Sequence, residues 1–498
     1  MKTISQFLSV FIVLISLGGC TKDFLSENNK SAITQENYFT TEAQAQAAVA
    51  GIYPMLQAFT QDIEFRGDAS WALMEMPVGH INTGGSQYKN GSIKHTNSAN
   101  EPVYSIIWSN FYKGIANANL SIKRIPGITM NEKAKNSLIG EAYFLRAVYY
   151  YYLVRLYGDI PLITEPIDFT SPNLYPERSA NEKVYEQIVS DLKAAEASGL
   201  PPVETTGKAS LGAVKSLLAS VYLTMAGYPL NKGADYYRLA AAKAKEVLDA
   251  RYYKLFDNYN YLHDRSHKNK DELIFQVQYL ASVKTNRITE FISPNGISKL
   301  TSELGTVTPI RAFVNSYEAG DKRTKEKEFY FTKAFARGST TKVVEFAPAL
   351  YKFWREEGAG ASGDGNSDQN WTLLRLPEVM LIYAEAINEI ESPDKFAYDQ
   401  LNYIRVRAEL LPLTNLSKVD FREAVWKERY HELAFENKSY FDVQRTHKVY
   451  NLLAGKFEDA FSYTNESGVK FNEQYMLWPV PQGELDANQK LKPQNKGW

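Results

Sequence analysis

The sequence has a single cysteine, Cys20, among its 498 residues. One thiol cannot form an intramolecular disulfide or a multi-thiolate metal site, so we expect packing alone to hold the fold. Lys plus Arg total 56 and Asp plus Glu total 57, and this balance gives no charge excess that would attract nucleic acid. After Cys20 no segment offers eighteen consecutive apolar residues, so no transmembrane helix is expected there.

The first twenty residues have the features of a lipoprotein signal. Lys2 supplies a positive charge, and the apolar stretch at 7–17 is shorter than the roughly 20 residues needed to cross a bilayer. The sequence LGGC that ends at Cys20 resembles the lipobox of bacterial lipoproteins, in which the thiol accepts a diacylglycerol. We expect a signal peptide at 1–19 and a lipidated tether at 20–36. The alternative is an ordinary signal peptide with a chance cysteine.

Helical periodicity dominates two parts of the chain, about 37–255 and 371–498. Apolar residues recur there at three-four spacing, which is typical of amphipathic helices. Ser179 and Glu182 have the spacing of a capping box. The expected helices include 108–125, 141–157, 211–225, 236–250, 377–390, 396–410 and 421–437. Their antiparallel pairs resemble tetratricopeptide units, so we expect a mainly α fold in which helix pairs form a superhelical scaffold.

Two long segments, 57–103 and 256–370, interrupt the helical pattern. They are rich in Gly, Ser, Thr and Asn, and short β-like runs such as 273–277 appear in the second. Long irregular segments in a compact protein are usually functional. We therefore expect one domain over 37–498 with loop-rich additions, the larger an insert at about 256–370 that contains short β-strands.

The sequence offers no clear catalytic constellation. The segment that starts at His431 begins like a zincin helix, but Phe435 stands where the second histidine is needed. Glu428, Glu432 and Glu436 share a helix face at i, i+4 spacing and could serve as acid and base in glycoside hydrolysis. The alternative is a structural ion-pair network, because several arginines lie nearby in the sequence: Arg405, Arg407, Arg429 and Arg445. We favour the network and expect no catalytic residue.

Candidate metal ligands are also incomplete. Asp364, Asn366 and Asp368 have the alternate spacing of a calcium loop, but the glycine and the final glutamate of such a loop are missing. His263 and His267 could share a helical face, but no third ligand accompanies them. We expect no metal and no cofactor, and a solvated polar loop at 364–368.

Several long motifs together resemble the SusD/RagB family of outer-membrane nutrient-binding lipoproteins. In chain order they are KDFLSENNKSAITQENYFTTEAQAQAAVAGIY, WSNFYKGIANANLSIKRIP, GEAYFLRAVYYYYLVRLYGDIPLI, RLPEVMLIYAEAINEI, LNYIRVRA, ERYHELAFENKSYFDVQRT and LWPVPQGELDANQKLKPQNKGW. No single motif decides the matter, but their order across nearly the whole chain is specific.

The resemblance implies a place outside the cell, at the surface of the outer membrane, with a lipid anchor. It implies a complex with a SusC-like TonB-dependent transporter, over which the protein acts as a lid. The expected function is non-catalytic capture of oligo- or polysaccharide and its delivery to that transporter. A binder of peptides or glycoprotein fragments in the same type of complex is the alternative. A secreted glycosidase and a helical-repeat adaptor that binds only protein are more distant hypotheses.

Sugars are bound by stacking on flat aromatic rings, with amides and carboxylates at the edges taking hydrogen bonds. The loop-rich segments hold Trp71, Tyr88, Trp354 and Trp371 in or beside polar sequence. Their expected polar companions are Asn82, Gln87, Asn90, Asp364 and Asn366. For each tryptophan the alternative is a place in the small core of its own loop. For each polar residue the alternative is ordinary solvation.

Overall fold

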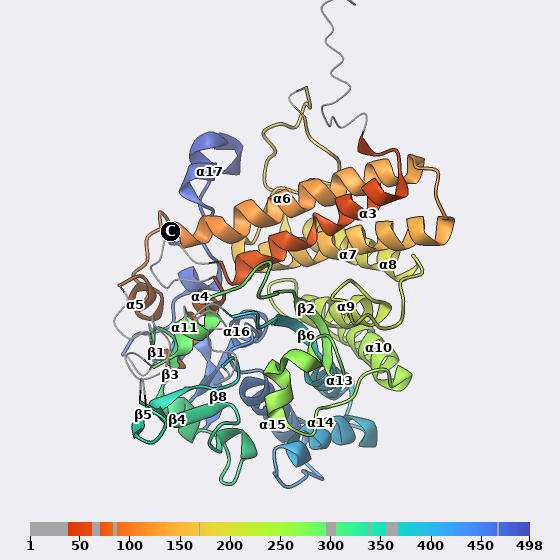
Figure 1. The fold of residues 1–498 in the computed structure, drawn as a ribbon. Coiled ribbons are helices and arrows are strands. Elements are labelled where there is room, and N and C mark those ends of the chain that lie inside the picture. Colours follow the sequence, from red (N-terminus) through yellow and green to blue (C-terminus); the bar gives the residue numbers. More distant parts are fainter. Residues whose placement is uncertain are drawn as a thin grey trace, which may run out of the picture.

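The computed structural model describes residues 38–61, 70–82, 87–168, 170–294, 305–336, 339–354, 367–465 and 468–498, and only the backbone of 87–90. The main helices are α3 (Glu42–Ala50), α6 (Val103–Arg124), α7 (Glu132–Tyr157), α8 (Asn181–Glu196), α9 (Leu211–Ala226), α10 (Ala234–Ala250), α13 (Leu376–Ile390), α14 (Lys395–Arg407), α15 (Lys418–Glu432), α16 (Ser439–Thr446) and α17 (Gln482–Ala487). Each helix from α6 to α10 packs on the next, and α13 packs on α10, α14 and α15. In Figure 1 they descend from α3, α6 and α7 in the upper part to α14 and α15 at the bottom, except that α17 lies apart at the upper left. The mainly α fold of paired helices is confirmed.

Local sequence explains the central pair, α6 and α7. The side chain of Asn131 accepts a hydrogen bond from the backbone N–H of Ala134 and caps the start of α7. The helix ends at Gly158, whose φ of +73° favours glycine. Gly114 of α6 lies against the ring of Tyr149, where a Cβ atom would come within 2.4 Å of the ring. The two helix backbones therefore approach closely at this point.

Short elements fill the two loop-rich segments. The first holds η2 (Tyr53–Phe59), α4 (Ser70–Leu73), η3 (Met76–Val78), β1 (Ile81–Asn82) and α5 (Gln87–Lys94). The second holds η5 (Tyr259–His263), η6 (Arg265–His267), β2 (Leu273–Val277), α11 (Ile288–Ile292), β3 (Thr308–Pro309), α12 (Arg311–Asn315), η7 (Lys322–Thr324), β4 (Tyr330–Phe335) and β5 (Val343–Leu350). With β6 (Trp371–Arg375), β7 (Lys448–Asn451) and β8 (Lys456–Asp459), the strands form four antiparallel pairs, β1–β3, β2–β6, β4–β5 and β7–β8. The β-like run at 273–277 is thus confirmed as a strand.

Two local predictions are wrong. The capping box expected at α8 does not form, because Ala180 is the N-cap and Ser179 pairs through its backbone with Ile160 in a β-bridge. The carboxylate of Asp159 instead accepts a hydrogen bond from the first backbone N–H of the helix, that of Asn181, at 2.8 Å. The helix expected over 421–437 ends at Glu432. Phe435 and Asn437 beyond it have φ values of 63° and 57°, which a helix cannot accommodate.

Buried apolar side chains form a continuous cluster that extends from Ala45 to Leu491. It joins the scaffold helices to the loop-rich segments, so the loops are packed against the helices and do not stand apart from them. The helices bury their apolar faces in this cluster. Among the described residues, no helix is both long and apolar enough to cross a membrane.

Candidate functional site

The two loop-rich segments meet in space although they lie far apart in the sequence. Asn82 of β1 pairs with Thr308 of β3, and Ile81 pairs with Pro309. Figure 1 shows α4, α5, α11, β1 and β3 gathered on one side of the molecule, away from α10 and α14. We call this region, where the described parts of 57–103 and 256–370 come together, the loop junction.

Two of the predicted ligand-binding tryptophans pack on each other inside the loop junction. The ring centroids of Trp71 and Trp371 are 5.4 Å apart, and the ring of Phe353 stacks on Trp371 at 5.3 Å. Trp71 is 0% exposed and Trp371 1% exposed. Asn437 anchors the pair from the scaffold, since its side-chain amide donates to the backbone carbonyl of Trp71 at 2.6 Å.

Trp354 is also enclosed. Its ring stacks on Phe331 of β4 with centroids 4.7 Å apart, and the residue is 3% exposed. The structure therefore brings Trp71, Trp354 and Trp371 into one region but encloses all three rings. Their burial favours the alternative that they form the core of the loops, because a ring packed on both faces presents no surface to a sugar. Ligand contact by these tryptophans stays a prediction.

Of the polar residues predicted to bind the ligand, Asn82 is the one whose side chain the structure describes. Asn82 is exposed at the end of β1, beside Thr308. The side chains of Gln87, Tyr88 and Asn90 lie outside the described part of the structure, as do Asp364 and Asn366 and the lipidation site Cys20. Their roles stay predictions.

Asp368 is the last residue of the expected calcium spacing, and two basic side chains of the protein bind its carboxylate. Its carboxylate accepts a hydrogen bond from Arg265 at 2.8 Å and lies 3.6 Å from the ammonium group of Lys268. The side chains of His263 and His267 lie against different rings and do not form a pair of ligands. His263 packs edge-on against Tyr351, and His267 stacks on Tyr261. Within the described ranges, no cluster of three metal-ligating side chains is present.

The three glutamates at 428, 432 and 436 belong to a buried ion-pair network. Glu432 is bound by Arg375 at 2.7 Å, by Arg407 at 2.6 Å and by Arg323 at 3.1 Å. Burial raises the pKa of its carboxyl, but the three guanidinium groups outweigh burial and hold the pKa below its usual value. A carboxylate held ionised and 0% exposed cannot exchange protons with a bound sugar.

The partners of this network were only partly predicted. Arg407 binds Glu432, and Arg405 lies 3.6 Å from Glu428, as expected. Arg429 and Arg445 instead bind Asp442, at 3.1 Å and 2.8 Å. The other basic partners of the glutamates come from the loop-rich segments and β6, and the spacing of the sequence did not suggest them. They are Arg323, Lys352 and Arg375. The network therefore ties α15 to the loop junction.

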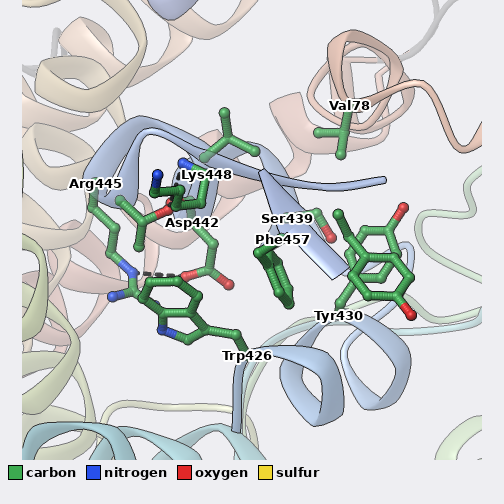
Figure 2. Close-up of a pocket in the computed structure, with 11 residues that line it drawn as sticks. Val78, Trp426, Tyr430, Ser439, Asp442, Arg445, Lys448 and Phe457 are labelled. Carbon is green, nitrogen blue, oxygen red and sulfur yellow. Dashed lines mark hydrogen bonds and ion pairs between the residues drawn. The ribbon is translucent and has the colours of Figure 1, made fainter. Parts of the chain in front are cut away.

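Figure 2 shows a pocket between α15, α16 and the β7–β8 hairpin. The rings of Trp426, Tyr430 and Phe457 border it, and Asp442 bonds to Arg445 next to Trp426. Its volume is about 20 Å³, which holds one water molecule and no sugar ring.

A much wider groove lies along α14. It has a volume of about 820 Å³, and rings from two chain segments border it, that of Tyr253 after α10 and those of Phe396 and Tyr403 on α14. These residues were not expected from the sequence, because ligand-binding rings were expected in the loop-rich segments, whereas two of the three belong to a helix. A signal was present, since Tyr403 lies off the buried face of α14, which Ala397, Leu401 and Ile404 form.

Comparison with known proteins identifies the family. The SusD family model matches residues 219–498, more than half of the chain, and a model described as starch-binding associating with outer membrane matches residues 23–223. The chain belongs to the SusD family. The family expected from the sequence motifs is thus confirmed.

Relatives of this SusD-family protein match along almost its entire length. It is 28% identical to SusD-like protein P2 of Formosa agariphila, over 99% of both chains. A crystal structure of a SusD superfamily protein from Parabacteroides distasonis has a TM-score of 0.87 and 33% identity, and covers 94% of this chain and 100% of that one. A laminarin binding SusD-like protein has a TM-score of 0.75 and 25% identity, and covers 92% of this chain and 100% of that one.

Proposed function

We propose that this SusD-family protein captures an oligo- or polysaccharide outside the cell and delivers it to a SusC-like TonB-dependent transporter. The observation that carries the proposal is the whole-length match to the family, which includes a laminarin-binding member that this chain covers end to end. Lipid on Cys20 would hold the protein at the outer membrane, because more than one acyl chain gives a stable anchor.

We place glycan capture at the loop junction. Both loop-rich segments contribute to it, and strand pairing at Asn82 and Thr308 holds them together. The protein would act by binding alone. The carboxylates that could have served as acid and base are locked in ion pairs with Arg323, Arg375 and Arg407.

The test is binding of the full-length mature protein to a panel of neutral polysaccharides, with starch and laminarin among them. We expect at least one to retard the protein in affinity electrophoresis, with no reducing ends released. Tyr88→Ala and Asn82→Ala should weaken that binding, whereas Tyr175→Ala, an exposed tyrosine of another loop, should not. Release of reducing ends would overturn the non-catalytic assignment.

Delivery and anchoring need separate measurements. Cys20→Ala should move the protein from the membrane fraction to the soluble fraction. The wild-type protein should co-purify with a large β-barrel protein. If it binds peptides from digested glycoprotein and no glycan of the panel, the alternative ligand class is correct.

A further inference from the structure

The groove along α14 has the size of a ligand site. Its walls come from the end of α10, the segment after it, the first half of α13 and one face of α14. Its volume of about 820 Å³ lies within the range typical of small-molecule sites. In Figure 1, α10, α13 and α14 lie on the side of the molecule away from α5, α11 and β1. The groove is therefore separate from the loop junction.

Aromatic and apolar side chains are exposed at this groove. Tyr403 is 57% exposed and Val406 58% exposed, on the face of α14 that does not enter the core. The outer face of a helix in a folded domain normally carries polar residues. Tyr253 and Phe396 are half-buried along the same groove, so flat rings line it from two sides.

The floor of the groove supplies a hydrogen-bonding group. Gln400 lines it and is 4% exposed overall. Its side-chain amide can both donate a hydrogen bond to a ligand hydroxyl and accept one from it.

The charges at the groove balance one another. Lys322 lies 3.9 Å from Glu409, and the guanidinium group of Arg407 already binds Glu272 and Glu432. Arg251 and Asp257 remain, one of each sign. A groove with no net charge selects against strongly anionic or cationic ligands.

We propose that this groove is a second carbohydrate-binding site, which takes a segment of an uncharged glycan chain. The rings of Tyr403, Phe396 and Tyr253 stack on the apolar faces of sugar rings, and Gln400 bonds to hydroxyls at the floor. The inference rests on the proposed function and adds a second point of contact. Two sites on one protein raise the affinity for a long chain above that of either site alone.

The test uses the neutral polysaccharides of the panel above, with alginate as an anionic control. We expect Tyr403→Ala to weaken binding of the preferred neutral polysaccharide about fivefold to tenfold, and Tyr403→Phe to keep most of it. Tyr175→Ala is the matched control, because Tyr175 is 55% exposed and Tyr403 57%. Thermal unfolding of each variant checks that it is folded.

The outcomes separate the two proposals. If the wild-type protein binds a neutral glycan and Tyr403→Ala binds it equally well, the groove site is wrong and the proposed function stands. If the wild-type protein binds no glycan of the panel, the proposed function fails and the groove site fails with it. An effect of Tyr403→Ala on alginate alone would overturn the ligand class. Loss of the co-purifying transporter with unchanged glycan binding would show that the groove is a protein interface.

Discussion

The loop junction and the α14 groove use aromatic residues in opposite ways. In the loop junction the rings of Trp71 and Trp371 pack on each other and are almost completely enclosed. In the groove Tyr403 stands on a regular helix and leaves 57% of its surface exposed. Aromatic residues in polar sequence can thus serve packing, because the short helices and strands of the loop-rich segments need a core where they meet the scaffold. An exposed ring on a well-packed helix has no such task.

Removing a ring from the loop junction should have the largest effect on stability. Trp371→Ala leaves a cavity beside Trp71 and Phe353 and should lower the free energy of unfolding by about 3–5 kcal/mol. Urea unfolding followed by circular dichroism measures this loss. A loss below about 1 kcal/mol would mean that the ring is not part of a packed core.

A substitution in the buried ion-pair network should lower the free energy of unfolding nearly as much as Trp371→Ala does. Glu432→Gln leaves three guanidinium groups without their carboxylate and should cost about 3 kcal/mol. Glu318→Gln is the matched control, because Glu318 binds Arg405 with its own side chain 39% exposed and should cost at most about 1 kcal/mol. Equal losses in the two variants would contradict the difference in burial.

Mild acid should weaken the contact between the scaffold and the loop-rich segments. His431 of α15 lies 2.9 Å from the hydroxyl of Ser316 and stacks near Tyr317, and burial, aided by Arg323, lowers its pKa well below 6.5. The unfolded chain therefore takes up a proton below pH 6.5 and the folded chain does not, so stability falls as the pH drops. The slope contributed by this residue approaches about 1.4 kcal/mol per pH unit.

The measurement is urea unfolding at several pH values between 6.5 and 5, with each variant compared with the wild-type protein. Buried carboxyl groups whose pKa is raised, such as that of Glu428, contribute alike to both and cancel in the comparison. His431→Gln should flatten the slope in this window relative to the wild-type protein. His95→Gln should flatten it further, because burial lowers the pKa of His95 to about 4. A slope unchanged in both variants would show that the two rings are not held neutral.

The smallest effect on stability is expected at the groove. Tyr403→Ala should change the free energy of unfolding by no more than about 0.5 kcal/mol, because the side chain is mostly in solvent. Thermal unfolding in the absence of glycan measures it. A loss as large as that of Trp371→Ala would show that Tyr403 serves packing, and the contrast between the two regions would disappear.

Much of the fold follows from the sequence because helix pairs depend on local periodicity. The helices at 211–225 and 236–250 appear as α9 and α10 nearly as expected. The ends were harder to predict. The periodicity predicted that the last expected helix ends at residue 437, whereas α15 ends at Glu432. The chain turns there, and Glu436 still binds Arg375.

The candidate site could be predicted from the sequence less well than the fold. Composition found Trp71, Trp354 and Trp371 but could not tell which way a ring faces in an irregular segment, because no period relates neighbouring residues there. It also could not find Arg323 and Arg375 as partners of Glu432, since those contacts form between segments distant in the chain. The exposure of Tyr403 could have been predicted, because an amphipathic helix has a predictable outer face.

The pairing of β1 with β3 has a consequence for how the protein is made. Ile81 cannot pair with Pro309 until the whole chain between them has been synthesised. Contacts of such long sequence separation form slowly, because the intervening loop must be closed first. The helices of the scaffold can pair as they emerge, whereas the loop junction closes late. A newly made molecule can therefore have the first helix pairs of its scaffold, α6 to α10, before it has the surface at which we place ligand capture.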